Sequence, residues 1–217
     1  RGYIAVMRMN GSFADDIIDP EDMAVLDENC EYFGLKKSLL MENAGRAIIG
    51  ALKAKVGSLE GKGIVVVAGI GNNGGDGFVA ARHAAAEGGD VSVILLGRAE
   101  DIRTEESKAN WKILEEMIAK VRLFIATDPS SFEGLRELIH DADVVIDAIF
   151  GTGMRGRIRE PYSTGIDAIN SSKGLKVAVD IPSGIDPTTG EIADRAVKAD
   201  ITVTFHRKKT GLRERID

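Results

Sequence analysis

The chain has 217 residues, of which 44% are hydrophobic and 29% are charged, and this length suits one domain with a full core. The formal net charge of −6 argues against a surface that binds nucleic acid or an anionic membrane. The single cysteine, Cys30, excludes an intrachain disulfide and fits a reducing compartment, so we expect a cytoplasmic protein. No apolar run approaches the ~20 residues that a membrane-spanning helix needs.

The N-terminal part of the sequence predicts a lead followed by two helices. Residues 1–18 show no clear period, and we interpret them as a flexible lead to a single domain over residues 19–217. Asp19 is a good N-cap and a proline follows it, so a helix is expected from there to about Cys30. Lys37–Lys55 repeats apolar residues at three- and four-residue spacing, which predicts an amphipathic helix. The sequence leaves open whether these helices pack on the core or on a partner subunit.

From Ile64 onward, apolar strands alternate with helical stretches. We expect strands near Ile64–Ala68, Val91–Leu96, Val121–Ala126, Val144–Ile149, Val177–Ile181 and Ile201–Phe205. We expect helices near Gly77–Glu87, Thr104–Met117, Ser131–His140 and Pro161–Ser171. This alternation predicts right-handed crossovers and an α/β fold: a Rossmann-like, doubly wound, mostly parallel sheet with helices on both faces.

The stretch Ile64–Gly77 reads IVVVAGIGNNGGDG and joins a buried strand to a turn with five glycines, Asn72, Asn73 and Asp76. A strand, a glycine-rich turn and a helix in this order direct backbone N–H groups at an anion. The alternative is a tight turn with positive φ, but that needs only one or two glycines. The G-x-G-x-x-G match lacks an acidic residue at the end of the second strand, which disfavours an ordinary NAD-dependent dehydrogenase.

Polar residues collect where strands end, and in such sheets ligands bind outside the carboxyl ends of the strands. Asp147 and Asp180 each close an apolar strand, which points to ligand binding, metal binding or proton transfer. The loop Gly151–Arg157 holds three glycines and two arginines, which suit a phosphate cradle, although a solvated loop is the plainer alternative. Asn73, Asp147 and Ser183 could form an all-oxygen site for a hard cation.

Five motifs occur in order: LLMENAGRA, GIGNNGGDG, DAIFGTGMRGR, DIPSGID and TFHRKKTGL. As a set, covering roughly Ile18 to Leu212, they resemble the NAD(P)H-hydrate epimerase family, the N-terminal YjeF-type domain. The resemblance implies a Rossmann-like domain that interconverts the R and S forms of hydrated NADH and NADPH (NADHX and NADPHX) for metabolite repair. It also implies an NAD(P)H-hydrate dehydratase as functional partner, fused to this domain in many prokaryotes. A homodimer is a candidate assembly on separate grounds, because the helices over Asp19–Lys55 could pack on a partner subunit instead of the core.

The resemblance also assigns residues. Substrate contacts fall on Asn72, Asn73, Gly74, Gly75, Asp76, Gly151, Thr152, Gly153, Met154, Arg155, Gly156, Arg157 and Asp180. Potassium ligands fall on Asn73, Asp147 and Ser183. Asp180 is our first choice for proton transfer, with Lys209 as its partner.

Two departures from the family pattern stand near the end of the chain. Lys208 occupies the position where the family often has proline. The family usually continues past Leu212 with another strand, so we expect a chain truncated at its C-terminus.

The competing interpretation is a non-catalytic nucleotide-binding or scaffolding module of the same fold. The joint presence of Asn73, Asp180 and Lys209 favours the enzyme.

Overall fold

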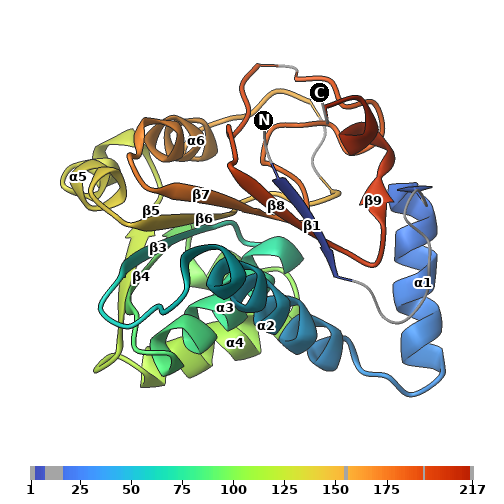
Figure 1. Ribbon diagram of the computed structural model, residues 1–217, viewed down its shortest axis with the longest axis horizontal. Helices are drawn as coiled ribbons and strands as arrows, with labels where there is room; N and C mark the ends of the chain where they lie inside the picture. The colour runs from blue at the N-terminus through green and yellow to red at the C-terminus, as the bar shows by residue number, and fades with distance from the viewer. Residues whose placement is uncertain (1–2, 8–16, 154–155, 193, 216–217) are drawn as a thin grey trace.

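The computed structural model describes residues 3–7, 17–153, 156–192 and 194–215, and its centre is a seven-stranded sheet with every strand parallel to its neighbours. The spatial order is β1-β8-β7-β6-β3-β4-β5 (Figure 1). The strands are β1 (Tyr3–Met7), β3 (Gly63–Ala68), β4 (Asp90–Leu96), β5 (Val121–Ala126), β6 (Val144–Ala148), β7 (Leu175–Val179) and β8 (Ile201–Phe205). The order reverses between β3 and β6, which is where doubly wound sheets bind ligands.

Helices cover both faces of this sheet, as the sequence predicts (Figure 1). One face carries α2 (Lys37–Val56), α3 (Asn72–Ala86) and α4 (Glu105–Glu116), and the other carries α5 (Leu135–His140) and α6 (Tyr162–Ser171). Strand β3 is apolar without alternation because Val66 packs into the first layer while Val65 and Val67 pack into the second. The predicted Rossmann-like α/β fold is confirmed.

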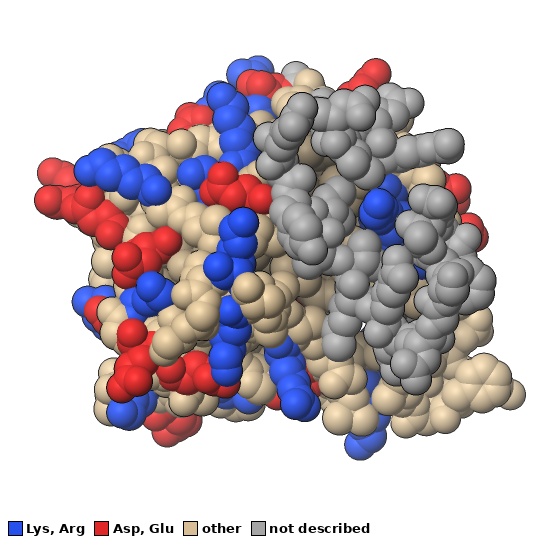
Figure 2. All heavy atoms as spheres, in the orientation of Figure 1, with Lys and Arg blue, Asp and Glu red and all other residues tan. Residues whose placement is uncertain are grey.

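Short elements complete the chain. They are β2 (Ile17–Ile18), α1 (Pro20–Tyr32), β9 (Lys208–Lys209) and the 3₁₀ turns η1 (Ala99–Asp101), η2 (Pro129–Phe132) and η3 (Thr210–Arg215). None of the helices in the described ranges is both long and apolar enough to cross a membrane. Figure 2 shows acidic and basic side chains intermingled over the left part of the face that it draws.

The flexible lead predicted for residues 1–18 is wrong for two segments. Tyr3–Met7 forms the edge strand β1 along β8, with Tyr3 opposite Ile201, and Ile17–Ile18 forms β2 along β9. Both strands take their hydrogen bonds from partners near the other end of the chain, so no local period in the sequence reveals them. Residues 8–16 lie outside the described ranges.

The predicted start of the helix after the glycine-rich turn is also wrong. The helix α3 begins at Asn72 rather than at Gly77, so most of the expected loop forms its first turns. None of the five glycines has a positive φ. They permit close packing instead: a Cβ on Gly74 would lie 1.9 Å from the carbonyl oxygen of Gly69, and one on Gly77 would lie 2.5 Å from the Cβ of Ala148.

Candidate functional site

A buried ion pair lies beyond the carboxyl ends of β7 and β8. Lys209 Nζ is 2.6 Å from Asp180 Oδ1, and the lysine is only 1% exposed. The Thr204 hydroxyl donates to the same oxygen at 3.2 Å, and Lys209 Nζ also donates to the Phe205 carbonyl at 3.1 Å. Within the described part of the chain these contacts all use Oδ1, which leaves Oδ2 for a substrate.

The backbone of Asp180 adopts φ = 66°, a left-handed conformation that residues other than glycine seldom occupy. This conformation directly follows β7, where the Asp180 amide donates to the Val203 carbonyl at 2.8 Å. Strained backbone of this kind costs about 1–3 kcal/mol and is concentrated at active sites. We therefore regard Asp180 as the centre of the candidate site.

A second buried carboxylate, Asp147 on β6, has no basic side chain among its hydrogen-bond partners in the described part of the chain. It accepts hydrogen bonds from the Ser183 amide (2.8 Å), the Ser183 hydroxyl (2.6 Å) and the Ile149 amide (3.3 Å). Burial raises the pKa of this carboxyl to about 6, although these hydrogen bonds act in the opposite direction. The ionised carboxylate of Asp147 would therefore be stabilised by a positive charge placed beside it.

The Asn73 side chain lies beside the loop that follows β6. A Cβ on Gly151 would lie 3.2 Å from Asn73 Oδ1, and the neighbouring Phe150 amide donates to the Ser183 hydroxyl at 2.9 Å. Asn73 is buried, and neither polar atom of its amide finds a hydrogen-bond partner among the described residues. An unsatisfied buried amide beside Ser183, which binds Asp147, is the arrangement that a hard cation would complete.

The first turn of α3 is held from two sides. The Ser107 hydroxyl at the start of α4 donates to the Gly71 carbonyl at 3.2 Å, just before α3 begins. A Cβ on Gly75 would lie 2.3 Å from Ser107 Oγ and 2.5 Å from Met41 Cε, so α2 and α4 both contact this turn. The free N–H groups of the turn keep the direction needed to bind an anion.

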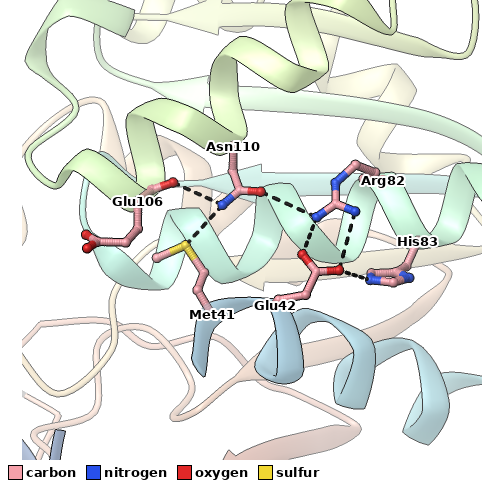
Figure 3. A network of polar contacts seen from close by, with 6 residues as sticks. All are labelled: Met41, Glu42, Arg82, His83, Glu106 and Asn110. Carbon is pink, nitrogen blue, oxygen red and sulfur yellow. Dashed lines mark hydrogen bonds and ion pairs between the residues drawn. The ribbon is translucent and has the colours of Figure 1, made fainter. Parts of the chain in front are cut away.

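A polar network behind this turn joins the same three helices (Figure 3). Glu42 of α2 accepts hydrogen bonds from Arg82 of α3 and lies 2.8 Å from His83 Nε2. The Arg82 hydrogen bond is the main reason that the pKa of Glu42 lies below its usual value. Asn110 of α4 donates to the sulfur of Met41 at 3.5 Å and so reaches the side chain that contacts the turn.

The loop after β6 borders a cavity of about 800 Å³. Its lining residues are Gly156, Arg157, Ile158, Arg159, Glu160, Ser163, Asp194 and Arg195. Asp180 and Lys209 do not line it, so this cavity and the buried ion pair are separate features. A buried ion pair is a stronger sign of a functional site than the volume of a cavity, so Asp180 remains the centre of the candidate site, and Arg157 lines the cavity instead.

The structure brings some of the residues that the sequence singles out into contact and leaves others apart. Ser183 binds Asp147 and the Phe150 amide, and the next residue along the chain, Gly151, lies beside Asn73, while Asp180 pairs with Lys209. Gly74 and Gly75 are buried and offer no side chain, while Asn72, Gly153, Gly156 and Arg157 are exposed and Asp76 and Thr152 are intermediate. Met154 and Arg155 lie outside the described ranges. Within those ranges, no cluster of three His, Cys, Asp or Glu residues could hold a metal ion, so a cation site there would combine fewer carboxylates with amide, hydroxyl or carbonyl oxygens.

Sequence reasoning missed two supporting residues. Thr204 donates to Asp180, and Ser107 binds Gly71. Thr204 stands inside the last strand, where threonine is common in any sheet, so nothing marks it. Ser107 lies three residues after the helix cap Thr104, a pattern that signals only a helix start.

Comparisons with known proteins identify relatives of this chain. The family described as "YjeF-related protein N-terminus" matches residues 37–211. A protein of Nitrosopumilus maritimus named "NAD(P)H-hydrate epimerase" is 44% identical over 200 residues, covering 92% of this chain and 89% of its own. A protein of Hyperthermus butylicus named "Bifunctional NAD(P)H-hydrate repair enzyme Nnr" is 50% identical over 198 residues, covering 90% of this chain and 35% of its own.

Among solved structures, yeast ynu0 (YNL200c) superimposes with a TM-score of 0.77 at 28% identity, over 90% of this chain and 82% of that one. The chain thus spans little more than a third of the length of the bifunctional relatives that it matches, 35% for one and 38% for another, but nearly all of the shorter relative. The match over residues 37–211 includes both buried carboxylates, the glycine-rich turn and Lys209. The chain belongs to the family described as YjeF-related protein N-terminus.

Proposed function

We propose that this chain is an NAD(P)H-hydrate epimerase, an isomerase that interconverts the R and S forms of hydrated NADH and NADPH. The observation that carries the proposal is the buried pair of Asp180 and Lys209 at the carboxyl edge of the sheet, with a further oxygen of Asp180 left for substrate. Relatives that match nearly the whole chain bear the name of this activity. The free N–H groups at the start of α3 supply an anion site for the pyrophosphate of such a substrate.

The reaction needs a general acid that donates a proton to the leaving hydroxyl and a general base that accepts a proton from the incoming water. The hydrated nicotinamide bears a hydroxyl on C6, next to ring N1. A general acid protonates that hydroxyl, the C6–O bond breaks, water leaves, and the N1 lone pair forms a planar iminium. Water then adds to C6 from the opposite face and loses a proton to a general base. Asp180 performs the proton transfers, with Lys209, 2.6 Å away, as its partner.

Asp180→Asn tests this assignment because the amide keeps the shape of the side chain but cannot transfer the proton. We expect turnover to fall by about 10²–10⁴-fold, the usual contribution of one positioned acid–base group. The assay gives mixed epimers of hydrated NADH to a dehydratase that consumes only one of them, and the chain is then added. Asp101→Asn, on the exposed turn η1, is the matched control and should keep full activity.

Full activity of Asp180→Asn would exclude Asp180 as the proton-transfer group. If the unchanged chain does not speed consumption of the second epimer beyond its spontaneous rate, the chain is a nucleotide-binding or scaffolding module instead. A thermal shift with NADP-type ligands would then detect the remaining binding.

We further infer a potassium site formed by Asn73, Asp147 and Ser183. Their oxygens are of the kind that potassium prefers, and the unsatisfied amide of Asn73 supports the assignment. A bound cation would favour the ionised form of Asp147, supply positive charge near the substrate and join the loops after β3, β6 and β7.

Potassium should therefore stabilise the chain. At ten times its dissociation constant a specific ion adds about 1.4 kcal/mol, or about 3–6 °C in the melting temperature of a domain of this size. Thermal unfolding in potassium, sodium and choline chlorides at equal ionic strength measures the effect. Asn73→Ala should abolish it, while Asn72→Ala, at the exposed neighbouring position, should retain it. Equal melting temperatures in all three salts would contradict the site.

The proposed partners follow from the reaction. An NAD(P)H-hydrate dehydratase that uses one epimer is the functional partner, whether fused or separate. A second copy of this chain is the proposed subunit partner. We also propose that the activity is cytoplasmic, because the cytoplasm contains nicotinamide cofactors and keeps a lone cysteine reduced.

A further inference from the structure

Two residues other than glycine have a positive φ in the described part of the chain: Asp180 at 66° and His206 at 64°. Each directly follows a strand, β7 or β8, and these two strands are neighbours in the sheet (Figure 1). A positive φ is uncommon at any residue that has a side chain. The proton transfers proposed for Asp180 give the first of these residues a function, whereas His206 has none among the contacts described above.

The backbone hydrogen bonds at both positions have the same form. The Ile181 amide donates to the Val179 carbonyl at 2.8 Å, and the Arg207 amide donates to the Phe205 carbonyl at 2.8 Å. A hydrogen bond between residues two apart, with a positive φ between them, is the form of γ-turn that is rare and strained. Strain of this kind persists only where the surrounding structure holds it, and it is concentrated at functional sites. The turn at His206 therefore needs an explanation like the one at the end of β7.

The turn at His206 directs a backbone carbonyl at the lysine of the site. The Phe205 carbonyl accepts the Arg207 amide and, at 3.1 Å, also accepts a hydrogen bond from Lys209 Nζ. A carbonyl oxygen has two lone pairs, so it can serve both donors. The Thr204 hydroxyl lies 3.3 Å from the Arg207 carbonyl and closes the loop from the other side.

The buried ammonium of Lys209 uses this carbonyl to complete its hydrogen bonds. It has three N–H groups and three acceptors in the described ranges: Asp180 Oδ1 at 2.6 Å, the Phe205 carbonyl at 3.1 Å and Thr204 Oγ1 at 3.5 Å. The lysine is 1% exposed, so water has little access to replace a lost acceptor. A buried charged donor that loses an acceptor carries the cost of its desolvation.

We propose that His206 is a positioning residue: its positive φ turns the Phe205 carbonyl toward Lys209 and so fixes the ammonium beside Asp180. The two γ-turns then act on the two members of one ion pair, because one carries the carboxylate and the other holds the lysine. The backbone at His206 performs this role, and the exposed imidazole is not required. The inference rests on the proposed epimerase reaction for its kinetic test, but not for the melting test that follows it.

Two substitutions that both remove the imidazole separate the backbone from the side chain. Glycine adopts a positive φ without strain, so His206→Gly should keep at least about half of kcat. A β-branched residue strongly resists a positive φ, so His206→Val should open the turn. One hydrogen bond to a charged group is at stake, and we expect kcat of His206→Val to fall by about 10- to 100-fold with little change in KM.

Initial-rate kinetics in the coupled dehydratase assay measure both constants. Equal losses of kcat in the two variants would assign the role to the imidazole, and full activity of both would show that the turn is not needed. Either result would overturn the proposal, and so would a change in KM alone.

Melting temperatures test the same coupling without an activity. Asp180→Asn combined with Lys209→Met removes the ion pair without leaving a buried charge unpaired. In that background, the difference in melting temperature between His206→Gly and His206→Val should be smaller by about 3–6 °C, because no ammonium loses an acceptor. The same difference in both backgrounds would show that the turn does not act on Lys209. An unchanged chain that fails to interconvert the epimers would contradict the proposed function, and the melting comparison would still decide the role of His206.

Discussion

At the scale of single residues, the two buried carboxylates of the site are stabilised in different ways. Asp180 has the ammonium of Lys209 at 2.6 Å, whereas Asp147 accepts hydrogen bonds from Ser183 and from the Ile149 amide and has no cationic partner in the described ranges. A buried carboxylate is costly unless it is paired, and the raised pKa of Asp147 reflects that cost. Asp180 is thus already paired within the chain, whereas Asp147 is the carboxylate that the proposed cation would pair with.

Two glycines of the turn give a matched pair of substitutions. Gly74→Ala places a Cβ 1.9 Å from the Gly69 carbonyl oxygen, where only backbone movement could relieve the clash, whereas a Cβ on Gly71 meets nothing within 4 Å. We expect Gly74→Ala to lower the free energy of unfolding by about 2–3 kcal/mol and Gly71→Ala by no more than about 1 kcal/mol. Urea unfolding of both variants measures the difference. Equal losses would show that the turn is not closely packed.

At the scale of elements, the short pair β2 and β9 positions the lysine of the site. Ile18 lies opposite Lys209 in this pair, and the Thr210 hydroxyl donates to the Asp19 carboxylate. On the other side, a Cβ on Gly211 would lie 2.3 Å from the Asp186 carbonyl oxygen, so the chain is tightly packed there too. The position of Lys209 thus depends on residues that precede α1.

Removing the hydrogen bond between Thr210 and Asp19 should therefore reduce catalysis. Thr210→Val keeps the side-chain shape and removes the donor, and one hydrogen bond is worth about 0.5–1.5 kcal/mol, so we expect kcat to fall by up to about tenfold. Thr210→Ser keeps the donor and should retain most of the rate. Initial-rate kinetics separate kcat from KM, and a change in KM alone would contradict a role in positioning Lys209.

The sequence predicts those elements whose signal is local. Strands such as β3 and β4 are continuous apolar runs, and the helix predicted over Lys37–Lys55 matches α2 closely. The start of α3 was not predictable, because glycines that serve close packing and glycines that serve a loop look alike in a sequence. The residues of the site likewise include some that a local pattern marks and others that it does not. Asp147 and Asp180 stand out at strand ends, whereas Thr204 acquires its role only through a contact 24 residues away along the chain.

At the scale of the whole molecule, stability should depend on pH through Glu42, which joins three helices. Its pKa is lowered in the folded state, so the folded state binds its proton more weakly than the unfolded state does. Its contribution is present above the ordinary pKa of 4.5 and is lost as pH falls through the folded-state pKa.

Glu42→Gln should consequently lower the melting temperature at pH 7 by about 2–4 °C, because a partly exposed network is worth at most about 1 kcal/mol. The difference between the two proteins should shrink as the pH is lowered below 4.5. Calorimetry at several pH values measures it, with Glu133→Gln, at an exposed position, as the control. A difference independent of pH would show that the carboxylate charge is not what joins the helices.

The pairing of β1 with β8 also bears on how the chain is made. Tyr3–Met7 leaves the ribosome before the other six strands of the sheet, but the strand that it pairs with, β8, leaves after all the rest. In the interval β3, β4 and β5 can assemble as one half of the sheet, and β6, β7 and β8 then extend the other half outward, one strand at a time. Until β8 has been synthesised, the nascent sheet therefore presents an open edge, and Tyr3–Met7 has no strand to pair with. Chaperones that shield such edges would act on this protein until Phe205 has left the exit tunnel.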